Sequence, residues 1–471
     1  MRAYERQVMN RIATPPGFAR PAFVPEAERV FRELVASRDD VEQVDAVLVD
    51  LNGIMRGKRM PVSDAAGRLF ESGMQIPHSV YLMDPRGEMT NPFGRGVGDG
   101  DPDGTAWPIP ESIRLAWTGA VPRIQMLMTL RDDNGAVDPA EPRAALERVL
   151  ERFHEARLTP VAAVELEFHL VDRERTEAGA PKPPARSRDA AHAVYDTADL
   201  DRYGDFLSAL AAAARLEGVP LNCVSSEYGP GQFEANLAHQ RDVLAAADHA
   251  IFLKRLVRAV AQATGLEATF MAKPYPSRAG SGLHVHVSLL DRDDRNVFDD
   301  GSLSGSPVLR NAIAGLQALM PESMALFAPS VNSYRRFQPD MFAPVNRRWG
   351  VNNRSVGIRV PAGPEQARRL EHRAAGADAN PYFVLAAVLA GIHHGLATKT
   401  DPGAPASGNV SRERDPELSL SIEDALARLR AARTLPSYLG EETLRLYAES
   451  KRLELERFRR IVPPHEYVWY L

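Results

Sequence analysis

Cysteine is almost absent from this sequence, since Cys223 is the single cysteine among 471 residues. An intrachain disulfide is therefore impossible, and nothing favours an oxidising compartment. Long apolar runs are also missing, because the longest, YFVLAAVLAGIHHGLA, is short for a bilayer and contains His393 and His394. The opening residues, MRAYERQVMN, carry charges where a signal peptide needs an apolar run. We therefore expect a cytoplasmic protein that does not span a membrane.

A large excess of charge of either sign is missing as well. The formal net charge is −5, which is mild for this length and implies no nucleic-acid or membrane-surface partner. The composition, 44% hydrophobic and 25% charged, is that of an ordinary globular protein. The length allows two or three domains, or one large domain with a smaller one.

The pattern of predicted secondary structure changes near residue 135. Residues 1–24 are polar and interrupted by proline, which predicts an arm. The segment VEQVDAVLVDLNGIMRGKRMPVS then predicts a hairpin that turns at Asn52-Gly53, and MTNPFGRGVGDGDPDGTAWPIP predicts a long exposed loop. From DPAEPRAALERVLERFHEARL onward, helical patterns alternate with strands. We predict an α+β protein with an arm at 1–24, a small strand-rich domain at 25–134 and a large domain at 135–471.

One predicted strand carries an unusual charged face. In VAAVELEFHL, residues 161–170, alternation places Val164, Leu166 and Phe168 on the core side. The other face carries Glu165, Glu167 and His169, whose neighbouring Cβ atoms would lie about 6 to 7 Å apart. Two carboxylates this close repel each other unless water or a cation separates them.

Further segments show the same kind of face. Charged or polar side chains alternate with apolar ones in GSGLHVHVSLL, SEYGPGQFEANL, GIRVP and RRLEHR. The side chains concerned are His284, His286 and Ser288; Glu227, Gln232, Glu234 and Asn236; Arg359; and Arg369, Glu371 and Arg373.

These faces admit two interpretations. Each strand alone can be the solvent face of an antiparallel sheet, where alternation is normal. Such faces usually carry Lys, Thr and Ser, however, whereas these carry Glu, His and Arg. Five glutamates and a histidine suit a hard cation such as Mg²⁺ or Mn²⁺, and arginines suit polyphosphate. Together the strands predict a metal–nucleotide site inside a curved sheet. The segment GRGVG lacks the strand-to-helix context of a phosphate loop and is a weak motif.

Six motifs occur in a fixed order: VELEFHL, SEYGPGQFE, MAKPYPSRAGSGLHVHVS, NSYRRFQPDMFAP, NNRSVGIRVP and RRLEHRAAGADANPY. In this order they resemble the motifs of glutamine synthetases, and the resemblance runs from about Val44 to the final PHEYVWYL. The wording of TFMAKP, MALFAPSVNSYRRF and APVNRRWGVNNRSVGIR is most similar to the γ-glutamylpolyamine synthetase (glutamate–putrescine ligase) branch. The resemblance implies an N-terminal β-grasp domain and a catalytic domain with a curved antiparallel sheet flanked by helices. It also implies stacked rings, usually homododecamers, in which a neighbour's N-terminal domain closes each active site.

The resemblance also implies roles for individual residues. Two divalent cations, Mg²⁺ or Mn²⁺, would be held by Glu165, His284 and Glu371, and by Glu167, Glu227 and Glu234. ATP would contact His286, Ser288 and Arg369. The catalytic arginines that grip its phosphates would be Arg354 and Arg359. Glutamate would be held by Arg336, Arg373 and the backbone of Gly280.

The implied reaction joins glutamate to an amine. ATP first phosphorylates the γ-carboxylate, which is otherwise a poor electrophile, and an amine then displaces the phosphate. Phosphoryl transfer needs positioning and neutralised charge, which metals and arginines provide.

The sequence departs from the family pattern at the amine site. The segment NSYRRFQPDMFAP corresponds to a flap of glutamine synthetases. Those enzymes carry a glutamate immediately before its Ala-Pro, where it helps bind ammonium, but here the residue is Phe342. A phenyl ring cannot act as a base, yet it can line a pocket for an alkyl chain, to which Trp349 and Tyr334 could contribute. The alternative is neutral drift in a loop.

Three further departures concern other parts of the sequence. Ala279 replaces an asparagine before GSG, which affects how glutamate is placed. The acidic loop of the N-terminal domain has no clear counterpart, although Asp99, Asp101 or Asp103 lies in that region. The loop after GLATKTDPG lacks the tyrosine that some bacterial relatives adenylylate.

Three functions follow from these observations. The first is a glutamate–amine ligase that uses a polyamine or another small primary amine. The second is a glutamine synthetase that uses ammonium despite its unusual flap. The third is a non-catalytic structural or sensing ring, which should have lost metal ligands, whereas this sequence retains all six.

Overall fold

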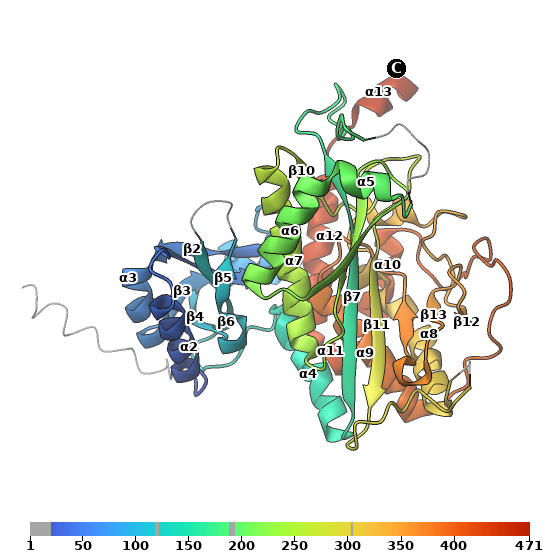
Figure 1. The fold of residues 1–471 in the computed structure, drawn as a ribbon, viewed down its shortest axis with the longest axis horizontal. Coiled ribbons are helices and arrows are strands. Elements are labelled where there is room, and N and C mark those ends of the chain that lie inside the picture. The colour runs from blue at the N-terminus through green and yellow to red at the C-terminus, as the bar shows by residue number, and fades with distance from the viewer. Residues whose placement is uncertain (1–19, 118–121, 188–193, 303–304) are drawn as a thin grey trace, which may run out of the picture.

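The computed structural model describes residues 20–117, 122–187, 194–302 and 305–471. They form an α+β fold with two sheets, a small one near the N-terminus and a large curled one covered by helices (Figure 1). The α+β class expected from the sequence is therefore confirmed. Most of the arm predicted at 1–24 lies outside the described residues, and helix α2 already begins at Val24.

The small sheet is mixed. Its order is β2-β1-β6-β4-β3, with β5 also paired to β6, and β1 runs parallel to β6. The predicted hairpin is confirmed, because β1 and β2 pair antiparallel around a loop in which Gly53 has a φ of 74°. The strands are β1 (Gln43–Val49), β2 (Met55–Pro61), β3 (Met74–Pro77), β4 (Asp103–Pro108), β5 (Arg114–Ala116) and β6 (Arg123–Arg131), and the helices beside them are α2 (Val24–Ala36) and α3 (Val62–Ala65).

The large sheet carries the charged faces. Its order is β12-β13-β14-β11-β7-β9-β8, with β10 beside β7, and all pairs are antiparallel except β12 with β13. The long strands β7 and β11 run side by side through its middle (Figure 1). The strands are β7 (Thr159–Val171), β8 (Leu221–Ser226), β9 (Gln232–Leu237), β10 (Glu267–Thr269), β11 (Leu283–Leu290), β12 (Trp349–Val351), β13 (Ile358–Val360) and β14 (Leu370–His372).

Local signals in the sequence explain where several helices begin. Helix α4 starts at Pro142, where a proline costs no backbone hydrogen bond. The side chains of Asp242 and Asn380 cap α7 and α9 by accepting hydrogen bonds from Ala245 N and Tyr382 N. The helices of this part are α4 (Pro142–Glu155), α5 (Thr197–Arg202), α6 (Gly204–Glu217), α7 (Val243–Ala263), α8 (Pro307–Phe327), α9 (Pro381–Thr398), α10 (Ile422–Ala431), α11 (Leu435–Leu439), α12 (Glu441–Arg459) and α13 (Pro464–Tyr470).

Helix α9 is the centre of the helical layer. Among the described residues it is the one helix long and apolar enough to cross a membrane, but 72% of it is buried inside the protein. It packs closely on α8, because a Cβ at Gly395 would lie 1.9 Å from the carbonyl oxygen of Asn311. A packed helix of this kind is apolar on every side because it is surrounded by protein.

The small sheet is fastened to the rest of the chain by polar contacts. Asn380 Nδ2, at the start of α9, donates a hydrogen bond to the carbonyl oxygen of Asp50 at 3.0 Å. The guanidinium of Arg255 on α7 pairs with Asp45 on β1. Strand β6 ends at Arg131 and α4 begins at Pro142, so the proposed boundary near residue 135 falls in the connection between them.

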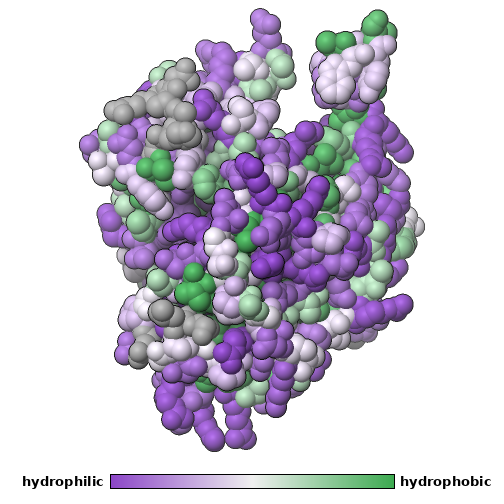
Figure 2. Space-filling view, turned by 90° about the vertical axis from the view of Figure 1, so that its right-hand side faces the viewer, coloured by the Kyte–Doolittle hydropathy of each residue, from purple (hydrophilic) through white to green (hydrophobic). Residues whose placement is uncertain are grey.

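The C-terminal helix α13 is exposed and projects from the top of the molecule (Figure 1). The side that carries β12 and β13 faces the viewer in Figure 2, where hydrophilic side chains dominate the surface.

Candidate functional site

Pairing between strands brings the predicted metal ligands face to face. In the register of the large sheet, Glu165 on β7 lies opposite His284 on β11, and Glu167 lies opposite Glu234 on β9. The next pair along, His286 and Glu371, joins β11 to β14. The apolar residues between them are buried on the other face, as alternation predicts. The sheet thus collects one charged surface from four strands.

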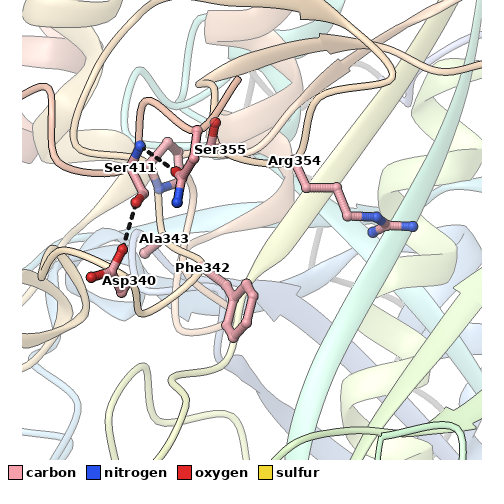
Figure 3. A pocket seen from close by; sticks show the side chains of 8 residues that line it. Asp340, Phe342, Ala343, Arg354, Ser355 and Ser411 are labelled. Atoms are coloured by element: carbon pink, nitrogen blue, oxygen red, sulfur yellow. Dashed lines mark hydrogen bonds between the residues drawn. The ribbon is translucent and has the colours of Figure 1, made fainter. Parts of the chain in front are cut away.

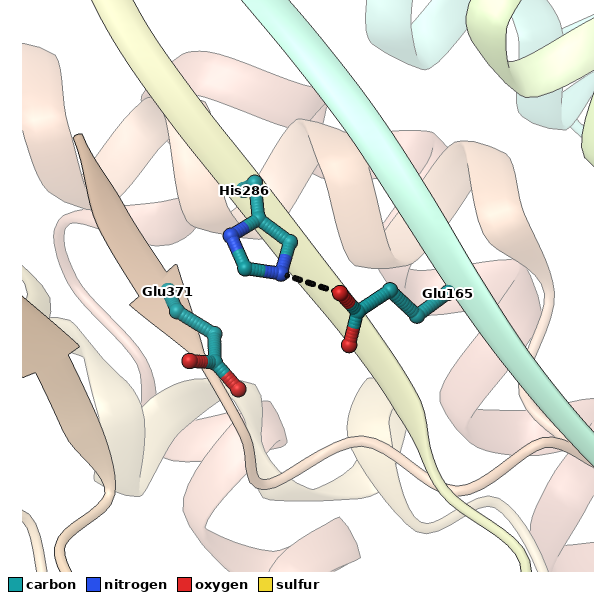
Figure 4. Close-up of side chains that lie close together, drawn as sticks. All are labelled: Glu165, His286 and Glu371. Carbon is teal, nitrogen blue, oxygen red and sulfur yellow. Dashed lines mark hydrogen bonds and ion pairs between the residues drawn. The ribbon is translucent and has the colours of Figure 1, made fainter. Parts of the chain in front are cut away.

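The ligand atoms come close enough to share a cation. Glu165, His286 and Glu371 offer atoms that lie within 4.8 Å of one another, and their side chains point toward a common space (Figure 4). Glu165, Glu234 and His284 form a second such group. His284 Nδ1 is 3.3 Å from Glu165 Oε2 and 3.9 Å from Glu371 Oε1. His286, expected to contact ATP, therefore also borders the metal ligands.

The carboxylates of this surface are crowded. Burial, followed by the charge of Glu167, raises the pKa of Glu227 to about 7. Burial and the charges of Glu165 and Glu167 raise the pKa of Glu234 to about 9. Burial opposes ionisation of Glu165 as well, but hydrogen bonds from His284 and His286 hold its pKa well below the usual range. Carboxyl groups crowded so closely that two of them favour binding a proton fit one or more divalent cations, which would neutralise them instead.

Glu371 is held by arginines. Its side chain is 1% exposed, and its two oxygens lie 2.7 Å from Arg359 Nη1 and 2.5 Å from Arg373 Nη1. Burial opposes its ionisation, but Arg373 and the neighbouring imidazoles outweigh burial and lower its pKa to about 2. The predicted phosphate-binding and glutamate-binding arginines therefore meet at one predicted metal ligand.

Other predicted ATP contacts lie along β11. Ser288 is two residues beyond His286 on the same face, and Arg369 Nε donates to His286 Nδ1 at 3.2 Å. His239, which sequence reasoning missed, packs edge-on against His286 with ring centroids 6.1 Å apart. Burial, and then the charge of His286, lowers the pKa of His239 to about 4, so that its ring is neutral at pH 7. His239 follows the end of β9, and no pattern in the sequence indicates that it lies beside His286.

The predicted glutamate contacts also converge. Arg336 is buried and donates to the carbonyl oxygen of Ala374 at 3.2 Å. Gly280 lies against it, because a Cβ on Gly280 would come within 2.7 Å of the Arg336 side chain. Gln232, whose face was noted but whose role was not, donates to Gly280 O at 3.1 Å. The structure thus joins Gly280, Arg336 and Gln232 at one end of the charged surface.

Phe342 lines a cavity of about 330 Å³ together with Arg354 (Figure 3). Phe342 is 53% exposed, and its backbone φ of 62° is left-handed, which is unusual for a bulky residue. It stacks on Tyr228, with centroids 4.6 Å apart and planes 25° apart. Sequence reasoning missed Tyr228, because nothing links two aromatic residues so far apart in the chain.

Trp349 and Tyr334 do not line this cavity as the sequence suggested. Trp349 is buried in β12, where its indole N–H donates to Gly403 O at 3.0 Å. Tyr334 donates from its hydroxyl to Met324 O at 3.4 Å and packs edge-on against Phe337. Both side chains are used in packing.

Three other candidates also have structural roles. His169 shares the charged face of β7, but it is fully buried beside Ser281, and burial lowers its pKa to about 3. In the N-terminal loop, Asp99 accepts hydrogen bonds from backbone N–H groups, and Asp101 accepts one from the Ser79 hydroxyl at 2.8 Å. Asp103 begins β4 and is exposed.

Tyr195 is a further residue that the sequence did not indicate. It is 64% exposed, and its φ of 59° is left-handed. Partial burial raises the pKa of its phenol. Its backbone N–H donates to the carbonyl oxygen of Ser226 at 3.0 Å, so Tyr195 lies beside the segment that carries the predicted metal ligand Glu227.

Comparison with known proteins identifies relatives over nearly the whole chain. The family model for the catalytic domain of glutamine synthetase matches residues 139–470. The γ-glutamylputrescine synthetase of Escherichia coli K12 is 41% identical over 456 residues, covering 96% of this chain and 95% of that protein. The glutamate–isopropylamine ligase of a Pseudomonas species is 30% identical, covering 93% of this chain and 98% of its own.

A solved structure has the same fold. The ADP complex of GmaS superposes with a TM-score of 0.79 and 28% identity, covering 93% of this chain and 99% of that one.

Proposed function

For this chain, which belongs to the glutamine synthetase family and is an ATP-dependent glutamate–amine ligase, we propose that the acceptor is an alkyl amine and not ammonium. The observation that carries this proposal is Phe342, which stands at the cavity beside Arg354 where the family pattern has a glutamate. A phenyl ring neither pairs with ammonium nor takes its proton, but it contacts an alkyl chain or an alkylammonium group favourably. The named relatives include ligases for putrescine and isopropylamine, so putrescine is the first acceptor to test.

The reaction proceeds in two steps. The terminal phosphate of ATP passes to the γ-carboxylate of glutamate, and the amine then attacks the acyl phosphate to give a γ-glutamyl amide and free phosphate. Arg354 and Arg359 would hold the transferring phosphate, while His286, Ser288 and Arg369 would hold the rest of ATP. Arg336, Arg373 and Gly280 would orient glutamate, so that its γ-carboxylate faces the phosphate. Fixed guanidinium groups suit this role because they are charged at every working pH.

The family is dependent on a divalent metal, and we propose two or more cations, Mg²⁺ or Mn²⁺, per site. Bound cations neutralise phosphate charge during the transfer. The crowded carboxylates support the presence of divalent cations. The two close groups, Glu165–His286–Glu371 and Glu165–Glu234–His284, share Glu165 and divide the ligands differently from the sets that the resemblance implies. The ligands would be Glu165, His284 and Glu371 for one cation, and Glu167, Glu227 and Glu234 for the other, with His286 at the edge of the first.

The proposal extends to the organisation of the protein. We divide the chain into a β-grasp domain at 25–134 and a catalytic domain at 135–471, preceded by an arm at 1–24. By resemblance to the family, we propose that the chains assemble into stacked rings, with twelve as the expected number. An acidic residue of the neighbour's N-terminal loop, Asp99, Asp101 or Asp103, would then face the amine. We assign the enzyme to the cytoplasm.

The test is glutamate-dependent release of phosphate from Mg-ATP with different amines at equal concentration. Putrescine, spermidine, ethanolamine, simple monoamines and ammonium form the panel. Strong release with one alkyl amine and little with ammonium is the expected result. Ammonium as the best acceptor would make the protein a glutamine synthetase and would overturn the interpretation of Phe342. Retention of all six predicted ligands and the arginines argues against the non-catalytic ring.

A further inference from the structure

The stacked pair of Phe342 and Tyr228 joins two parts of the site. Tyr228 directly follows Glu227, a predicted metal ligand, and comes from the loop between β8 and β9. Phe342 comes from the distant loop before β12 and lines the cavity that Arg354 also lines. The ring pair therefore links the loop that carries a predicted metal ligand to the wall of the cavity. In the proposed function the acceptor amine binds in this cavity beside Phe342.

The backbone around Phe342 needs to be held in place. Both Phe342 and Asp340 have a φ of 62°, a conformation that costs free energy for residues other than glycine. Asp340 is tied down, because it accepts a hydrogen bond from Ser411 Oγ at 2.7 Å (Figure 3). It also accepts hydrogen bonds from the guanidinium of Arg412. These contacts hold Asp340 and the loop backbone, and they do not involve the Phe342 ring.

Tyr228 supplies the contact to the ring itself. The offset between nearly parallel rings at 4.6 Å is a favourable arrangement for two aromatic side chains. Tyr228 is half-buried and lies in the β8–β9 loop. A ring held on one side by another ring presents a fixed apolar surface to a passing molecule.

We propose that Tyr228 is a positioning residue for specificity: it holds the Phe342 ring as an apolar wall of the acceptor channel. This inference rests on the proposed function and deepens it. The wall favours an acceptor with a methylene chain, because the chain covers the rings and loses contact with water. Ammonium has no such surface and gains nothing from the wall. The chemical class selected is a primary amine on an unbranched aliphatic chain.

The test compares kcat/KM for butylamine and for ammonium in four variants of the full-length protein. Tyr228→Val removes the stacking ring, Tyr228→Phe keeps it, Phe342→Leu removes the wall, and a double variant combines Tyr228→Val with Phe342→Leu. We expect Tyr228→Val to lower the ratio of kcat/KM for butylamine to kcat/KM for ammonium about fivefold. This fold-change corresponds to the interaction free energy of one aromatic pair. Tyr228→Phe should keep the ratio of the wild type. The ratio of the double variant should be no lower than that of Phe342→Leu alone. The effects of two substitutions that remove the same contact are not additive.

The outcomes separate this inference from the proposed function. An unchanged ratio in Tyr228→Val, or fully additive losses in the double variant, would overturn the positioning role while leaving the proposed acceptor intact. A wild type that prefers ammonium to every alkyl amine would overturn the proposed function instead. The KM values for glutamate and ATP should stay constant in Tyr228→Val, because a general loss of structure would move them together with the ratio.

Discussion

Replacing Glu371 with alanine removes the charge on which two arginines and a predicted cation depend. The Glu371 carboxylate is 1% exposed and is bonded to Arg359 and Arg373 at 2.7 and 2.5 Å. Taking one partner from a buried ion pair costs about 3–5 kcal/mol, because the remaining charges stay buried. The substitution also removes a predicted metal ligand, and a separate loss of about 4 kcal/mol of transition-state stabilisation would lower phosphate release about a thousandfold.

The assay is phosphate release from Mg-ATP and glutamate with each amine of the panel. Glu371→Ala should be inactive with every amine, because the loss precedes the amine step. Glu371→Gln keeps the shape of the side chain and should be nearly as inactive while unfolding less readily. Glu413→Ala is the matched control, since Glu413 pairs with Arg348 where both side chains are half exposed. An exposed pair of this kind contributes about 0–1 kcal/mol, so activity should persist. Substantial phosphate release by folded Glu371→Gln would refute the assignment of Glu371.

Three further predictions address specificity, metal and pH. Phe342→Glu should raise ammonium use relative to alkylamine use, measured as a ratio of kcat/KM values, and an unchanged ratio would remove Phe342 from the argument. Chelation with EDTA should abolish phosphate release, and added Mg²⁺ or Mn²⁺ should restore it; activity that survives exhaustive chelation would contradict the metal site. Burial raises the pKa of Glu217 from 4.5 to about 7, so the folded state disfavours its ionised form, and this part of the stability is lost as pH rises from about 4.5 through 7. We therefore compare the free energy of unfolding in urea of Glu217→Gln with that of the wild type, at pH 5 and at pH 8. The difference between variant and wild type should shift in favour of the variant by up to about 3 kcal/mol from pH 5 to pH 8. Equal differences at both pH values would show that Glu217 does not titrate in this range.

Alternation along the strands predicted the charged surface well. Val164, Leu166 and Phe168 are buried in the core, while Glu165 and Glu167 lie on the opposite face with their partners from β9 and β11. The period of a strand depends on backbone geometry alone, which is why a single sequence carries this information.

The burial of each side chain on this face, and which predicted ligands lie together, could not be predicted in the same way. His169 shares the face of Glu165 and Glu167, yet neighbouring loops cover it completely. His286 lies as close to the Glu165–Glu371 group as a ligand would, although the resemblance gave it a different role. Both outcomes depend on how the sheet curls and how loops cross it, and neither is encoded in a local pattern.

Contacts between loops that are far apart in the chain also could not be predicted from the sequence. Trp349 packs against Gly403 and leaves the cavity to Phe342, whose ring meets Tyr228 instead. Irregular segments have no period to analyse, so only their fold around the sheet brings such residues together.

We propose that this ligase joins glutamate to an alkyl amine. The most direct measurement supplies the wild-type protein with glutamate, Mg-ATP and equal concentrations of putrescine and ammonium, and identifies the products by mass spectrometry. The account predicts that γ-glutamylputrescine dominates. Glutamine as the main product would contradict it.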